Sequence, residues 1–238
     1  MTQDRWKLRI QKRGVAFFLI VKQWAIYVKN ALVSNNVSWK DVPGYKTILK
    51  AILLEMKERD IAYYPEALKE TTCALLYNEK LINIFVTIVL KKTHAFDVPA
   101  VSSSCELIAS WFTTVHKNKQ LVPPQFDYTL LFKAIQMLMD LDHGMSTAKC
   151  IWMLYRIFHI IPVKQRYLLL AQILGHHKFY HYFFHWSFNV RMVFCLSKSR
   201  LFCFRKALTL STTAYSCLIS PWRLANFSWN SVCCCSAP

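Results

Sequence analysis

The segment YKTILKAILLEMKERD, residues 45–60, repeats apolar side chains at the spacing of an α-helix. Ile48, Ile52 and Met56 lie four residues apart with Lys and Glu opposite, as in a helix that packs on one face. Similar segments recur as far as residue 196, and the chain has only 4 Gly. We therefore predict an all-α fold, an irregular armadillo/HEAT-like stack of about nine helices joined by short connections. No repeat of fixed period is visible.

Local signals place several helix ends. Asp127 is expected to cap a helix, and Gly144 to stop it. Ser103 and Glu106 form a capping-box pattern that predicts a helix start near Ser102. Residues 79–92 suit either a strand, by their Ile and Val content, or a buried helix, by their length.

Charge is distributed unevenly along the chain. The net charge is +17, and all 13 acidic residues precede position 143, whereas residues 143–238 carry 11 Lys or Arg. Such an excess points to an acidic partner, which could be nucleic acid, an anionic membrane or an acidic protein surface, unless the C-terminal part is simply atypical polypeptide. We expect a helical domain over residues 1–196, or a fragment of a longer helical protein. Residues 197–238 read as a poorly ordered basic tail rich in Ser and Cys.

The nine cysteines include no Cys-x-x-Cys pair, so no zinc ribbon or thioredoxin-like motif is predicted. Scattered single cysteines suit a helical core in a reducing compartment, which favours a cytoplasmic location. VAFFLIV, residues 15–21, is too short for a convincing signal sequence before Lys22 interrupts it. No uncharged apolar run reaches the length of about 18 residues that a spanning helix needs.

The N-terminal segment is basic and amphipathic, and an aromatic residue lies within it. Such a helix can lie on an anionic membrane surface, or it can simply cover a helical bundle. The candidate membrane-surface residues are Arg5, Trp6, Arg9, Lys12 and Arg13.

Four histidines crowd into HHKFYHYFFHW, residues 176–186. On one continuous helix, His177, His181 and His185 would share a face and could hold zinc. Their nearest carboxylate in sequence is Asp142, more than thirty residues away, and their neighbours are core-type aromatics. An aromatic packing helix is therefore the favoured interpretation, and the three histidines are weak metal candidates. The DLDHG segment, residues 140–144, could bind a cation or do acid–base work, but a solvated helix end is the favoured interpretation.

Motifs for known chemistries are absent from the sequence. It contains no Gly-x-Ser-x-Gly, Walker, Gly-x-Gly-x-x-Gly or kinase pattern, so we predict no enzyme, no catalytic residues and no cofactor. It also lacks the homeodomain, zinc-finger and RNA-recognition signatures, so nucleic acid is not the expected partner.

The segment FYHYFFHWSFNVRMVF, residues 179–194, resembles an uncharacterised family of large helical eukaryotic proteins, a domain of unknown function best sampled in fungi and slime moulds. The resemblance implies no catalytic residues, and some members are labelled membrane proteins. We expect Phe183, Phe184, Trp186 and Arg191 to form an interaction surface. The predicted function is a scaffold that binds a protein partner. The alternatives are a peripheral membrane protein and a metal-dependent enzyme built on the histidines.

Overall fold

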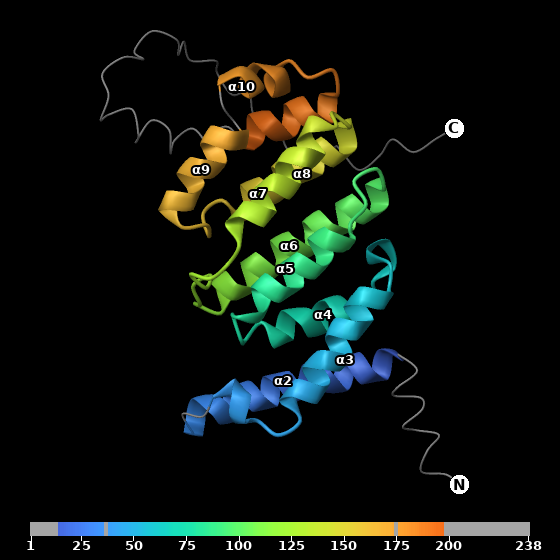
Figure 1. Ribbon diagram of the computed structural model, residues 1–238, viewed down its shortest axis with the longest axis vertical. Coiled ribbons are helices and arrows are strands. Elements are labelled where there is room, and N and C mark those ends of the chain that lie inside the picture. Colours follow the sequence, from blue (N-terminus) through green and yellow to red (C-terminus); the bar gives the residue numbers. More distant parts are fainter. Residues whose placement is uncertain (1–13, 36–37, 174–175, 198–238) are drawn as a thin grey trace, which may run out of the picture. The chain divides into compact units, whose positions relative to one another are not determined.

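The computed structural model describes residues 14–35, 38–173 and 176–197, and every regular element in those ranges is helical (Figure 1). The all-α prediction is confirmed. The helices are α2 (Val15–Asn35), α3 (Tyr45–Glu58), α4 (Glu66–Leu75), α5 (Leu81–Lys92), α6 (Val98–Lys117), α7 (Tyr128–Asp140), α8 (Gly144–Ile157), α9 (Val163–Ile173), α10 (His176–Phe183) and a final helix, Phe188–Ser197. Two short 3₁₀ turns, Trp39–Asp41 and Ile61–Tyr63, flank α3.

Two groups of sequence predictions lie outside the described residues. The first is the N-terminal set, Arg5, Trp6, Arg9, Lys12 and Arg13. The second is the tail, because the description ends at Ser197. The boundary near residue 196 and the membrane-surface role of the N-terminal residues therefore stay predictions.

The helices pack in two interleaved rows. Helices α2, α4, α6 and α8 contact one another in succession, and α3, α5, α7 and α9 do the same. The rows are joined where α5 meets α6 and α7 meets α8. Each helix from α2 to α9 thus packs on a helix two positions away along the chain, which is how a stack of helix pairs buries its apolar faces. The finer armadillo/HEAT-like assignment stays a prediction.

Helix α6 forms the centre of the core. Trp111 and Phe112 are fully buried there, and the Trp111 ring lies 5.5 Å from that of Phe85 on α5. The Trp111 indole Nε1 donates to Thr72 Oγ1 of α4 at 3.0 Å, so its polar atom is satisfied in the interior. Apolar packing with one matched hydrogen bond therefore ties α4, α5 and α6 together.

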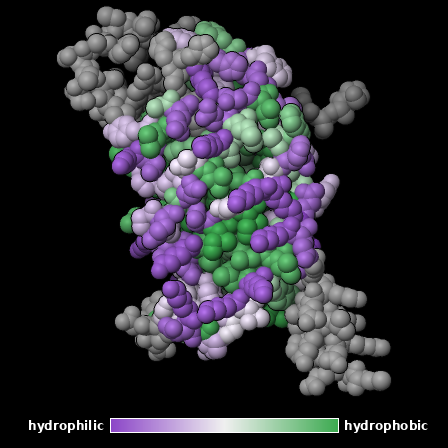
Figure 2. Space-filling view, in the orientation of Figure 1, coloured by the Kyte–Doolittle hydropathy of each residue, from purple (hydrophilic) through white to green (hydrophobic). Residues whose placement is uncertain are grey.

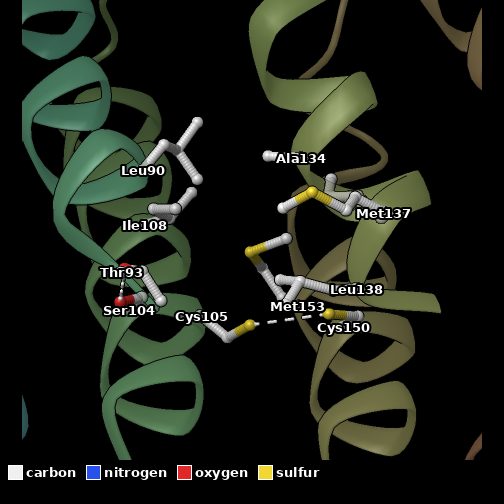
Figure 3. A pocket seen from close by; sticks show the side chains of 11 residues that line it. Leu90, Thr93, Ser104, Cys105, Ile108, Ala134, Met137, Leu138, Cys150 and Met153 are labelled. Carbon is white, nitrogen blue, oxygen red and sulfur yellow. Dashed lines mark hydrogen bonds between the residues drawn. The ribbon is translucent and has the colours of Figure 1, made fainter. Parts of the chain in front are cut away.

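A small cavity of about 30 Å³ lies between α5–α6 and α7–α8 (Figure 3). Cys105 of α6 and Cys150 of α8 face each other at its edge, with 3.9 Å between their sulfurs. Both are free and buried, and the Cys105 hydrogen bond and burial raise the pKa of the Cys150 thiol. These two cysteines behave as small core residues, as expected from their scattered placement.

Several helix boundaries differ from those predicted. Helix α6 starts at Val98 because Asp97 accepts from the Ala100 N–H, so Ser103 and Glu106 lie inside the helix and form no capping box. Gly144 begins α8 instead of stopping α7. Asp127 does cap α7, accepting from the Leu130 N–H at 2.9 Å. The ambiguous segment at residues 79–92 contains helix α5.

Helix α2 is apolar on two sides. Phe18, Val21, Ala25 and Val28 are buried, and Thr71 of α4 donates to the Phe18 carbonyl at 2.8 Å. On the other side Val15, Leu19, Ile20 and Tyr27 are exposed.

Among the described helices, α2 alone is long and apolar enough to cross a membrane, over Val15–Leu32 with mean hydropathy 1.3. That window includes two lysines, and Lys22 pairs with Glu70 of α4 at 2.8 Å. The helix therefore qualifies on mean hydropathy, not as an uncharged run. On the molecular face shown in Figure 2, polar side chains surround an apolar area near the middle.

Candidate functional site

The aromatic packing helix predicted for the histidine-rich segment is interrupted. Helix α10 ends at Phe183, and the next helix begins at Phe188. We call residues 184–188 the aromatic turn. Because α10 stops before His185, one unbroken helix does not carry all three histidines, and the prediction of such a helix is wrong.

Arg191 holds the aromatic turn in place. Its Nη1 donates to the carbonyl of His185 at 2.6 Å and to that of Trp186 at 3.0 Å. These carbonyls lie in the turn after α10, outside that helix, and the guanidinium supplies them with a hydrogen-bond donor. The guanidinium also lies 5.9 Å from the centre of the Phe188 ring. Arg191, which we predicted to contact a partner, is thus engaged by its own chain.

Gly144, the first residue of α8, lets the turn approach closely. A Cβ at this position would lie 2.8 Å from Ser187 Cβ and 3.4 Å from the Trp186 ring. Glycine is required at this position because Ser187 occupies the space that a side chain would need.

Two histidines converge on one carboxylate at this corner. His185 Nε2 lies 2.7 Å from Asp142 Oδ1, and His181 Nε2 lies 3.1 Å from the same oxygen. The His185 side chain is fully buried, while His181 and Asp142 are partly exposed. We call Asp142, His181 and His185 the His–Asp cluster. The side chain of His177 lies outside the described residues.

Asp142 occupies an unusual backbone position. Its φ of 53° places it in the left-handed region just after α7, where glycine or asparagine is more common. Its neighbour Asp140 forms an ion pair with Lys178 of α10 at 2.6 Å. Two carboxylates of the DLDHG segment therefore bind α10 and the turn after it. Asp140 pairs with Lys178, and Asp142 contacts the two imidazoles.

The local hydrogen bonds determine charge and tautomer. Burial acts to raise the pKa of Asp142, but the hydrogen bonds from His185 and His181 prevail and hold it below its ordinary value. The backbone N–H of Ser187 donates to His185 Nδ1 at 3.0 Å. Because Nδ1 accepts this hydrogen bond, the proton that His185 shares with Asp142 lies on Nε2, which donates the hydrogen bond to the carboxylate. Burial, with help from both carboxylates, raises the pKa of Tyr182, so that phenol stays neutral.

The turn projects three aromatic side chains from this polar support. Phe184 and Trp186 are each 72% exposed and Phe188 is 65% exposed. Phe183 is half-buried and stacks on Phe179 at 6.0 Å. Of the four predicted interaction residues, Phe184 and Trp186 lie on the surface, whereas Phe183 and Arg191 support them. Phe188 was missed, although its place in the same aromatic run is the signal that points to it.

A comparison with known protein families matches the part of the chain that contains the aromatic turn. The model of a family described as "Protein of unknown function (DUF1765)" matches residues 82–205, about half of the chain. The UPF0592 membrane protein C7D4.03c of Schizosaccharomyces pombe is 27% identical over 118 residues, which make up 49% of this chain and 12% of the relative. The chain thus corresponds to a small part of that protein. No solved structure matches the chain.

The matched region includes α6 to α10, the His–Asp cluster and the aromatic turn. It contains the whole segment on which the resemblance to an uncharacterised eukaryotic family was based, and that resemblance is confirmed. The chain belongs to the DUF1765 family of proteins of unknown function.

Proposed function

We propose that this protein is a non-enzymatic helical scaffold that binds a protein partner through the aromatic turn. The observation that carries the proposal is the exposure of Phe184, Trp186 and Phe188 on a turn whose backbone is fixed by side-chain hydrogen bonds. Isolated exposed apolar residues are ordinary, but three large aromatics on one held turn are not.

The fixed backbone makes these aromatics suited to binding. Aromatic side chains are enriched among the residues that dominate interface energies. A turn already held by Arg191 and Ser187 loses little conformational freedom when a partner covers it. Binding energy from ring burial is therefore not consumed in ordering the loop.

The charge of the region indicates the kind of partner. Residues 143–197 contain six Lys or Arg and no Asp or Glu. An apolar protein segment flanked by acidic residues would complement both the rings and this charge, and acidic groups would also speed the encounter.

Site-specific photocrosslinking in cells tests the proposal. We would place a photoreactive phenylalanine analogue at Phe184 or at Phe188, one per protein. Phe96, which is 75% exposed between α5 and α6, is the matched control position. We expect one defined protein to crosslink from both turn positions and not from position 96. Equal crosslinking from all three, or none from the turn, would contradict the proposal.

A second function, association with a membrane surface, is favoured by helix α2. Its outer side exposes Val15, Leu19, Ile20 and Tyr27, and the yeast relative is named a membrane protein. Because the inner side packs on α4, we propose attachment along the surface and not a span.

Flotation with vesicles containing anionic lipid tests this second function. Ile20→Glu should reduce the bound fraction severalfold, because it places a charge on the outer side of α2. Leu121→Glu is the control, since Leu121 is exposed but belongs to a loop. Equal flotation of both variants and the unmodified chain would argue against the role of α2.

A further inference from the structure

We propose that the His–Asp cluster binds a divalent transition metal ion of the Zn²⁺ class. His181 Nε2, His185 Nε2 and a carboxylate oxygen of Asp142 all lie within 4.8 Å of one another. This is the only such group of three among the residues that the structure describes. The inference is independent of the proposed partner binding.

The donor set matches the chemistry of zinc. Imidazole nitrogen and carboxylate oxygen are common Zn²⁺ ligands, at about 2.0–2.2 Å from the metal, so neighbouring ligand atoms lie about 3.3 Å apart in a tetrahedral site. The carboxylate oxygen is now 3.1 Å from one imidazole nitrogen and 2.7 Å from the other. Small side-chain movements would therefore convert two hydrogen bonds to one carboxylate into three metal bonds.

The charge around the cluster also favours a cation. Asp140 is paired with Lys178, but the ion-pair partners of Asp142 within the described ranges are the two imidazoles. When these rings are neutral, the Asp142 carboxylate keeps an uncompensated negative charge. A dication would neutralise it while using the lone pairs of both rings.

The ion can enter from solvent without unfolding the corner. Asp142 and His181 have side chains that are 43% and 45% exposed, whereas His185 lies at the closed inner end. Water would complete the coordination on the exposed side. The metal would connect the end of α7, helix α10 and the aromatic turn, three pieces that meet here through side chains.

Metal binding would also alter the hydrogen bond from the Ser187 amide to His185 Nδ1. The Nε2 proton of His185 must leave that nitrogen, and the ring keeps its single proton on Nδ1, so no net proton is released from the neutral ring. Ser187 N–H then faces Nδ1–H and loses its acceptor. The metal-bound state should therefore show a displaced Ser187 amide, which links the cluster to the aromatic turn.

Titration of the purified full chain with Co²⁺, followed by Zn²⁺ competition, tests the inference. We expect one Co²⁺ per chain with visible bands of a nitrogen- and oxygen-ligated site, without the thiolate charge-transfer bands that cysteine ligands would give. Asp142→Asn and His181→Ala should each weaken this binding about tenfold or more, because each removes a ligand. Both positions are partly exposed, so the variants should fold, as checked by circular dichroism.

Two controls identify the site. His159→Ala and His94→Ala each remove a histidine outside the cluster, and both should bind Co²⁺ with the affinity of the unmodified chain. A Ser187 amide resonance that shifts with Zn²⁺ in the unmodified chain but not in Asp142→Asn would support the coupling. Absence of Co²⁺ binding, thiolate bands alone, or unchanged affinity in Asp142→Asn would overturn the inference.

Discussion

Trp111 and Trp186 lie in the same family-matched region but in opposite environments. Trp111 is 0% exposed in α6, with its indole nitrogen bonded to Thr72, whereas Trp186 is 72% exposed. The position of Trp186 is fixed through its backbone, because Arg191 binds its carbonyl, and its ring stacks on His185 at 5.4 Å. Packing thus fixes Trp111, whereas hydrogen bonds to the backbone fix Trp186 and leave most of its side-chain surface free for another molecule.

Trp111→Ala should give the largest effect on stability. Removing a fully buried tryptophan leaves a cavity and takes away the indole N–H that donates to the Thr72 hydroxyl, so we expect a loss of about 3–5 kcal/mol in the free energy of unfolding. Urea unfolding followed by circular dichroism measures it. A loss below about 1 kcal/mol would show that α6 is not the centre of the core.

Gly144→Ala tests how closely the turn is held. The new Cβ would overlap Ser187, so we expect a loss of about 1–3 kcal/mol in unfolding free energy, accompanied by displacement of the aromatic turn. Ser187→Gly removes the overlapping atoms, and in the double variant it should recover most of that loss. If the double variant is as unstable as Gly144→Ala, the two residues are not in contact.

Tyr128→Phe examines a polar group within the core. The Tyr128 hydroxyl is buried and finds no hydrogen-bond partner among the described residues. Replacing it should raise the free energy of unfolding by about 1 kcal/mol at neutral pH. A clear loss in thermal or urea unfolding would instead reveal a partner for this hydroxyl.

The same variant has an expected dependence on pH. Burial raises the pKa of Tyr128 above its ordinary value, so the folded state disfavours the ionised ring. The unmodified chain binds more protons when folded than when unfolded above about pH 10, and its stability falls there as pH rises. The stability advantage of Tyr128→Phe should widen above that pH and stay constant between pH 6 and about 9. A gap that narrows above pH 10 would contradict this.

Trp186→Ala should change stability least. Its exposed ring contributes little to folding, so the free energy of unfolding should stay within about 0.5 kcal/mol of the original. Crosslinking of the partner from Phe184 should nevertheless fall severalfold. Comparing this variant with Trp111→Ala tests the difference between the two tryptophans directly. A large stability loss in Trp186→Ala would show that the exposed ring is also part of the packing.

The fold was predictable to the extent that it depends on local spacing. The apolar periodicity of residues 45–60 identified α3, and the cap at Asp127 was found because its hydrogen bond spans only three residues. The capping box at Ser103 failed because Asp97, farther upstream, caps the helix first. Residues 79–92 were ambiguous because a helix that packs against neighbours on more than one side, as α5 does, loses its amphipathic pattern.

The candidate site depends on contacts between distant residues. Asp142 meets His181 and His185 from positions 39 and 43 residues away, a distance that sequence spacing does not bridge. The sequence singled out both segments but could not join them. It also gave no sign of the break in the helix, because Arg191 and Gly144 stabilise that break through tertiary contacts.

Hydrogen exchange at the aromatic turn tests most directly whether hydrogen bonds from Arg191 and Ser187 hold this exposed surface in place. The Ser187 amide, bonded to His185, should exchange slowly in the unmodified chain and at least about tenfold faster in Arg191→Ala, while amides of α6 keep their rates. Fast exchange of Ser187 in the unmodified chain, equal to that of an unstructured peptide, would show that the turn is not held and would contradict the account.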